Sequence, residues 1–157
     1  MNRIITISRE FGSGGREIGR RLAEKMGIAY YDQEIITELI NRTDFAEEYI
    51  RHMDEKAPIP LLPITTARTF GVPTNYVVEQ NLKFYMQESK VIQDFAEKSD
   101  CVIVGRCANY ILKDKALSLF IYAPFEDRLK TVMERTGREE KSARKMIKKI
   151  DKDRRAY

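Results

Sequence analysis

Hydrophobic positions in the first forty residues alternate between short apolar runs and helical spacing. Residues 4–7 are rich in β-branched side chains and predict a first strand. Ile18, Leu22 and Met26 recur at every fourth position, which predicts an amphipathic helix with its apolar face on the core. A second short strand is expected at 28–31, followed by another amphipathic helix. This order of strand, glycine loop, helix, strand and helix is how a parallel α/β sheet begins.

The middle of the chain is less regular. Apolar residues after position 44 predict a further helix, and prolines and glycine over 54–75 predict a loop-rich insertion. A long helix is expected over 76–98, and its inward-facing residues are predicted to be Leu82, Tyr85, Ile92 and Phe95.

The last third of the chain continues the alternation. Two buried strands are predicted at 101–104 and 117–122, a helix follows Pro124, and a final helix covers 139–157. Four strands separated by helices favour one α/β domain over 1–157 with an open parallel sheet. Ligands of such sheets bind outside the carboxyl ends of the strands, so the loops after the first three strands are the candidate sites.

Composition limits the class of protein. The chain has 157 residues, of which 43% are hydrophobic and 33% charged, a balance typical of one folded domain. No apolar run approaches the roughly 18 residues that a membrane-spanning helix needs, and the N-terminus does not resemble a signal peptide. We therefore expect a cytoplasmic protein without membrane contact. A single histidine and two separated cysteines argue against a histidine-dependent triad and a zinc cluster.

The net charge of +4 leaves nucleic acid open as a partner, since the last helix is also basic. However, the 24 acidic residues are interspersed among the 28 basic ones, which argues against a nucleic-acid-binding module.

The segment 8–19 carries the strongest chemical pattern. It places Gly12, Ser13, Gly14 and Gly15 between the first strand and the first helix. Glycines let backbone N–H groups approach an anion, and a helix N-terminus adds positive charge, so this segment is predicted to bind phosphates. The alternative is a tight strand-to-helix turn.

The standard phosphate-binding loop reads GxxxxGK[ST], and this loop departs from it. Arg9 replaces the first glycine, and Gly15 falls on the lysine position. Arg16 is expected to supply the missing charge. Ser13, through its hydroxyl, and Glu17, directly or through water, are the candidate ligands for Mg²⁺.

Two longer stretches, ITISREFGSGGREIGRRLAEKMGIAYYDQEII and VIVGRCANYIL, resemble the cytidylate kinase-like family. The resemblance implies a P-loop α/β fold, ATP as phosphoryl donor, Mg²⁺, and a nucleoside monophosphate or similar small acceptor. It also implies that 44–98 forms an acceptor-side helical insertion and that 136–157 resembles a lid. Relatives continue with a further strand and helix, which this chain lacks.

The same resemblance assigns roles. The glycine loop corresponds to the ATP phosphate site, Asp32 lies near the reacting phosphates, Arg106 binds the acceptor phosphate, and Arg154 closes over the transferring group. Cys107 stands where relatives carry an aspartate that recognises the sugar. Gln33 and Glu38 replace residues that bind the monophosphate in cytidylate kinases, so the acceptor is not specified.

Each assigned residue also has a structural interpretation. Asp32 is a candidate helix N-cap, Arg106 a candidate salt-bridge partner, and Arg154 a candidate solvated helix residue. Arg128 is expected to pair locally with Glu126 and Asp127. The aromatic residues Tyr76, Phe84 and Tyr85 are interpreted as core residues, with stacking on a nucleotide base as the alternative.

The leading functional hypothesis is therefore ATP-dependent phosphoryl transfer to a small phosphate or hydroxyl acceptor. The first rival is a nucleotide-binding regulator that has lost turnover, and the second is a nucleic-acid-binding module. Whether the protein forms a homo-oligomer is left open.

Overall fold

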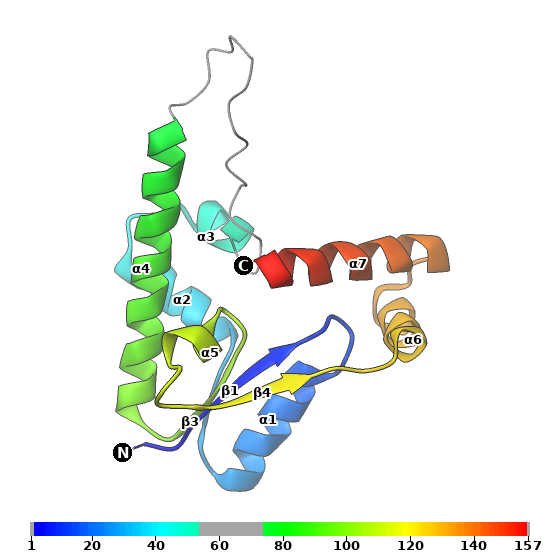
Figure 1. Ribbon diagram of the computed structural model, residues 1–157, viewed down its shortest axis with the longest axis horizontal. Coiled ribbons are helices and arrows are strands. Elements are labelled where there is room, and N and C mark those ends of the chain that lie inside the picture. The colour runs from blue at the N-terminus through cyan, green and yellow to red at the C-terminus, as the bar shows by residue number, and fades with distance from the viewer. Residues whose placement is uncertain (1, 54–73, 157) are drawn as a thin grey trace.

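The computed structural model describes residues 2–53 and 74–156, so most of the expected insertion at 54–75 lies outside the described residues. Its sheet has four parallel strands in the order β2-β3-β1-β4 (Figure 1). The prediction of an open parallel α/β sheet flanked by helices is confirmed. The elements in chain order are β1 (Ile4–Arg9), α1 (Gly15–Met26), β2 (Ala29–Tyr31), α2 (Gln33–Arg42), α3 (Glu47–Met53), α4 (Thr74–Lys98), β3 (Cys101–Val104), α5 (Ala108–Ile111), β4 (Leu117–Ile121), α6 (Phe125–Thr136) and α7 (Glu140–Ala156).

Helix α1 covers one face of the sheet through its smallest residues. Its buried positions are Gly15, Gly19 and Ala23. A Cβ atom on Gly19 would lie 3.0 Å from the Ile7 side chain, so the helix backbone lies almost against the strand. Ile18 is 44% exposed, and its predicted place in the core is wrong. The helix approaches the sheet too closely for a large side chain at the contact.

Helices α2, α3 and α4 cover the other face and form the larger hydrophobic core. The buried positions of α4 in this core include Phe84, Val91, Ile92 and Ala96, and Glu88 is buried beside them. These residues, and not the predicted ones alone, form the inner side of α4.

The predictions for the inner side of α4 are confirmed in part. The prediction that Ile92 faces the core is confirmed, whereas that for Leu82 is wrong, because Leu82 is 57% exposed. Tyr85 and Phe95 are half-buried. The core interpretation of Phe84 is confirmed, whereas Tyr76 is exposed.

Strand β4 differs from its prediction. All four residues of β3 are buried, as expected for a strand between two others. β4 pairs only with β1 among the described strands, and its Leu117 and Phe120 are each 61% exposed. The prediction of a buried strand is wrong here because an apolar run does not tell a central strand from an edge strand.

Helices α6 and α7 form a third group beside the sheet (Figure 1). They share a small apolar cluster of Leu129, Val132, Ala143 and Ile147, against which Phe11 of the glycine loop packs. This contact places α7 next to the carboxyl end of β1. None of the helices in the described part of the chain is long and apolar enough to cross a membrane.

Candidate functional site

The glycine loop joins β1 to α1 in a conformation that two glycines make possible. Gly12 and Gly14 have φ angles of 80° and 82°, in the left-handed region that side chains disfavour. A Cβ atom on Gly12 would lie 2.9 Å from the Val132 side chain and 3.0 Å from the Arg128 carbonyl oxygen. The loop is therefore packed against α6 and held in one conformation.

The backbone amides of the loop divide into two groups. The amide of Glu10 donates to the Ile121 carbonyl at 3.0 Å, that of Phe11 to the Asp151 carboxylate at 2.8 Å, and that of Ser13 to the Glu10 carbonyl at 3.3 Å. By contrast, first-turn amides of a helix have no intrahelical acceptor, and no side chain caps the start of α1. The donors suited to an anion are thus those at the start of α1.

These first-turn amides adjoin a cavity of about 410 Å³, which we call the loop cavity. It is lined by Arg9, Glu10, Phe11, Gly12, Gly14, Gly15, Arg16, Glu17, Thr131, Arg135 and Arg154. A second and wider cavity of about 550 Å³ lies beyond the ends of β1 and β3. It is lined by Ser8, Arg9, Glu10, Tyr85, Gly105, Arg106, Cys107, Asn109, Tyr110, Phe120, Asp151, Arg154 and Arg155.

The two cavities adjoin each other. Arg9, Glu10 and Arg154 line both of them. Two arginines and one glutamate therefore lie where the cavities adjoin, so a group passing from one cavity to the other would meet a net positive charge.

Arg16 and Asp32 form an ion pair beside the loop cavity. The Arg16 Nε atom lies 2.8 Å from Asp32 Oδ2, and the Asp32 side chain is only 8% exposed. Asp32 occupies the N-cap position of α2, as its structural interpretation predicted, but its side chain makes no capping hydrogen bond. Arg16 lines the loop cavity and Asp32 holds its guanidinium. Burial, with the Asp32 charge second, raises the pKa of the neighbouring Tyr30 to about 12.

Of the two candidate Mg²⁺ ligands, Glu17 lines the loop cavity, whereas Ser13 is not among the residues that line it. The Ser13 hydroxyl donates to the Glu10 carbonyl at 2.8 Å. The Glu17 carboxylate accepts hydrogen bonds from Arg20 and Arg21, which lower its pKa to about 2. Glu17 is therefore ionised at neutral pH and lines the loop cavity.

The donor set fits Mg²⁺ bound together with a nucleotide. Mg²⁺ keeps several waters and uses one or two carboxylates plus substrate phosphates. Among the residues that the structure describes, no three acidic, histidine or cysteine side chains cluster as a protein-only metal site. Glu10 and Glu17 both line the loop cavity, so the cavity offers the one or two carboxylates that Mg²⁺ bound to a nucleotide needs.

Arg106 lines the wider cavity and also forms a buried salt bridge, as its structural interpretation predicted. Its Nη1 atom lies 3.2 Å from Glu88 Oε1 of α4, and both side chains are almost fully buried. Gly105, Arg106 and Cys107 all have positive φ angles, of 78°, 56° and 52°. Non-glycine residues in this conformation store strain and occur often at functional sites. Burial, and next the Glu88 charge, raises the pKa of the Cys107 thiol to about 11.

Arg128 forms a different contact from the one predicted. Instead of pairing with its neighbours in α6, it donates to Asp151 of α7 at 2.7 Å and lies 3.2 Å from the Glu10 carboxylate. It also donates to the carbonyl of Phe11 in the glycine loop at 3.1 Å. The prediction of local pairing is wrong because the side chain turns inward, where these acceptors converge.

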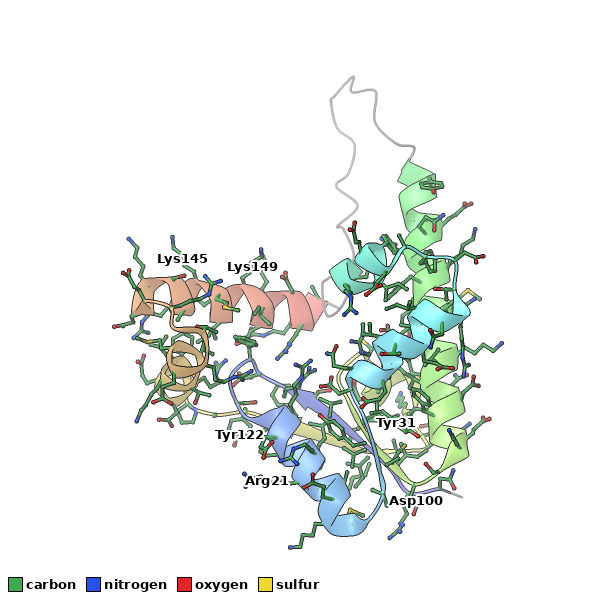
Figure 2. All side chains as sticks on the ribbon, turned by 180° about the vertical axis from the view of Figure 1, so that it is seen from behind. Arg21, Tyr31, Asp100, Tyr122, Lys145 and Lys149 are labelled. Atoms are coloured by element: carbon green, nitrogen blue, oxygen red, sulfur yellow. The ribbon has the colours of Figure 1, made fainter. Side chains whose placement is uncertain are left out.

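The end of α7 also contacts the loop. Arg154 donates to the Arg9 carbonyl at 3.4 Å, and its guanidinium lies 5.5 Å from the centre of the Phe11 ring. The interpretation of Arg154 as a solvated residue is therefore wrong. Figure 2 shows Lys145 and Lys149 pointing away from the sheet on the outer side of α7. The basic residues of this helix are thus divided between its outer face and the cavities.

Sequence reasoning placed Arg9 in the phosphate-binding segment without giving it a role, and it missed Asp151 altogether. Arg9 carried a signal, because a basic residue directly after a buried strand lies at the carboxyl edge of the sheet. Asp151 carried none, because it is one acidic residue among many on a charged helix.

The fold and this site define the class of protein: an α/β protein with a glycine loop and two adjoining cavities at the carboxyl edge of a parallel sheet. The chain belongs to the cytidylate kinase-like family, whose sequence model matches residues 4–157. This family membership indicates a nucleotide kinase fold.

A solved structure supports the same fold. The crystal structure of an uncharacterized protein from Eubacterium ventriosum ATCC 27560 is 32% identical to this chain, with a TM-score of 0.67. The match covers 99% of this chain and 75% of that one. No curated protein is significantly similar to this chain.

Proposed function

We propose that this protein transfers the γ-phosphoryl group of ATP to a nucleoside monophosphate or a similar small acceptor. The observation that carries the proposal is the pair of adjoining cavities that share Arg9 and Arg154, in a chain of the cytidylate kinase-like family. The loop cavity would hold the ATP phosphates and the wider cavity the acceptor. Their common boundary is where the phosphoryl group would pass.

The donor side would depend on backbone donors and on one arginine side chain. The loop segment from Gly12 to Glu17 would surround the phosphates, with the first-turn amides of α1 as hydrogen-bond donors. Arg16 would add a cation, and Asp32 would position that cation through the ion pair at 2.8 Å. Phosphoryl transfer depends mainly on such positioning and charge neutralisation.

The acceptor side depends on two arginines. Arg106 would orient the acceptor phosphate, and its strained backbone and Glu88 partner would keep the guanidinium in one place. Arg154 lines both cavities, so it would stabilise charge on the phosphoryl group during transfer.

Mg²⁺ bound with ATP would neutralise charge on the phosphates. Glu17 would hold it directly or through water, because this carboxylate is ionised and lines the loop cavity. The Ser13 hydroxyl gives its proton to the Glu10 carbonyl, so its oxygen lone pairs remain for a cation.

A second candidate function is a nucleotide-binding regulator without turnover. Gly15 at the lysine position favours it, since that lysine normally contacts the β- and γ-phosphates. In this function ATP would bind to the loop cavity, and no acceptor would be phosphorylated.

The test measures ADP release with Mg²⁺–ATP and each nucleoside monophosphate in turn, together with ATP binding by calorimetry. The kinase proposal expects ADP release that depends on one or more acceptors. ATP binding without ADP release for any acceptor would favour the regulator, and absence of ATP binding would exclude both.

A variant links the binding to the site. Arg16→Ala is expected to raise the ATP dissociation constant several-fold, because a charge-assisted contact is lost. Lys25→Ala removes the same charge from the exposed last turn of α1 and is expected to bind ATP as the wild type does. Wild-type affinity in Arg16→Ala would remove Arg16 from the site.

A further inference from the structure

The glycine loop carries the residue types of the standard phosphate-binding pattern in exchanged positions. Without gaps, the pattern GxxxxGK[ST] covers residues 9–16 and requires glycine at position 9 and lysine at position 15. This chain has Arg9 and Gly15 there. The sequence alone therefore raises the question of whether a cation at position 9 compensates for the missing cation at position 15.

The two exchanged residues, Arg9 and Gly15, also lie side by side in the structure. A Cβ atom on Gly15 would lie 2.6 Å from the Cβ and 2.9 Å from the Cγ of Arg9, closer than real Cβ contacts. Gly15 does not have a positive φ angle, so its backbone conformation does not require glycine. The requirement comes from Arg9, whose side chain occupies the space that a lysine at position 15 would need first.

Arg9 is held firmly at the place where phosphates would lie. It is the last residue of β1, its backbone pairs with Ile121 of β4, and the residue is only 7% exposed. It lines both the loop cavity and the wider cavity, and its carbonyl accepts a hydrogen bond from Arg154.

Arg16, the residue that the sequence suggested for this role, is placed differently. Its side chain is 47% exposed and its guanidinium is bound to Asp32. It lines the loop cavity only, whereas Arg9 lies at the boundary of the two cavities. The two arginines therefore face different parts of a nucleotide that extends toward the acceptor.

We propose that Arg9 replaces the phosphate-binding lysine and binds the terminal phosphates of a nucleoside triphosphate at the boundary between the cavities. The proposal rests on the proposed function, since it assumes that the loop cavity holds a nucleotide. A guanidinium suits this role because it can bind two phosphate oxygens at once and stays charged at any physiological pH.

The first experiment compares the affinities of Arg9→Met for ATP, ADP and AMP by calorimetry. Methionine keeps an unbranched side chain but removes the charge. ATP affinity is expected to fall about 10- to 100-fold, the range for loss of a charged hydrogen-bond donor, and AMP affinity by much less. The control is Arg3→Met, which removes the same charge just before the opposite end of β1 and is expected to bind all three nucleotides as the wild type does.

The second experiment restores the standard pattern. Gly15→Lys alone is expected to bind ATP more weakly than the wild type, because the new side chain collides with Arg9. The double variant Arg9→Gly with Gly15→Lys removes the collision and returns a cation to the loop. Its preference for ATP over AMP is expected to exceed that of Arg9→Met.

The outcomes separate the two proposals. If the wild type binds ATP and folded Arg9→Met binds it equally well, or loses ATP and AMP affinity to the same extent, Arg9 has only a structural role and the proposed function stands. If the wild type binds no ATP, both proposals fail. If Arg9→Met does not fold, the variant Arg9→Lys replaces it in the test. Arg9→Lys keeps a cation and is expected to retain the preference for ATP over AMP. Loss of that preference in folded Arg9→Lys would contradict the proposal.

Discussion

Two buried arginines stabilise the two sides of the candidate site in different ways. Arg106 contacts Glu88 at 3.2 Å, with both side chains at most 1% exposed, and so connects the end of β3 to α4. Arg128 contacts Asp151 at 2.7 Å, with both side chains 7% exposed, and so connects α6 to α7. Arg128 also binds a carbonyl of the glycine loop, through Phe11.

The difference lies in what each pair holds in place. The Arg106–Glu88 pair fixes a wall of the wider cavity inside the core that α4 forms with the sheet. The Arg128–Asp151 pair fixes the loop itself, because Asp151 accepts the Phe11 amide as well. We therefore expect loss of the first pair to affect mainly folding, and loss of the second to affect both folding and nucleotide binding.

The largest expected effect is that of Glu88→Leu. It leaves the buried Arg106 charge without its carboxylate, and breaking a buried pair in this way costs about 3–5 kcal/mol of unfolding free energy. Denaturant titration without nucleotide measures this loss. The double variant Glu88→Leu with Arg106→Met replaces both charges by apolar groups and is expected to recover most of it.

The matched control for Glu88 is Gln93→Ala on the exposed side of α4, which should change the unfolding free energy by less than about 0.5 kcal/mol. A similar small change in Glu88→Leu would contradict the importance of the buried pair. Equal losses in the single and double variants would indicate that Glu88 acts through packing and not through its charge.

Asp151→Asn is expected to have a smaller effect on folding and an additional effect on binding. The variant weakens the contact with Arg128, and loss of a charged hydrogen bond costs about 1.5–3 kcal/mol. Since the Phe11 amide and Arg128 both depend on this carboxylate, the loop should be less ordered and ATP affinity should fall. Denaturant titration and calorimetry measure the two effects.

Asp153→Asn makes the same charge change two residues further along α7 and serves as the control. It should leave both quantities near the wild-type values. An unchanged ATP affinity in Asp151→Asn would show that the loop keeps its conformation without α7, and the contrast between the two arginine pairs would then concern stability alone.

The parallel fold was predictable because its signals are local. The β-branched run before the glycine loop and the fully apolar run at 101–104 each indicated a strand, and the structure has both. Distinctions that depend on neighbours were not predictable. Ile18 looked like a core residue, yet the close approach of α1 buries Gly19 and leaves Ile18 exposed.

The candidate site shows the same limit. The glycine loop and Arg106 were recognisable from sequence because family motifs mark them. The contacts between Arg128 and Asp151, and between Arg9 and Gly15, depend on how distant or adjacent side chains fill one space. No spacing rule encodes such contacts, so only the structure reveals them.

The smallest expected effect comes from an exposed pair, Arg3 and Asp100, at the opposite end of the sheet from the cavities. The Arg3 amide and its Nε atom donate to the Asp100 carboxylate at 2.8 and 2.7 Å. These two hydrogen bonds, the backbone one first, hold the pKa of Asp100 below its ordinary value of 3.8. Figure 2 shows Asp100 at the edge of the molecule, far from Lys145 and Lys149 of α7.

A lowered pKa in the folded state means that the ionised carboxylate stabilises the fold above about pH 4, and that this stabilisation disappears as the pH falls through the folded pKa. Asp100→Asn should therefore be slightly less stable than the wild type at pH 7. The difference should shrink as the pH falls below about 4, which denaturant titrations at pH 7 and at acid pH can measure. Solvent screens this pair, so its loss should be smaller than that of either buried pair. A loss at pH 7 as large as that of Glu88→Leu would contradict the view that burial, and not the number of contacts, decides how much each arginine pair contributes.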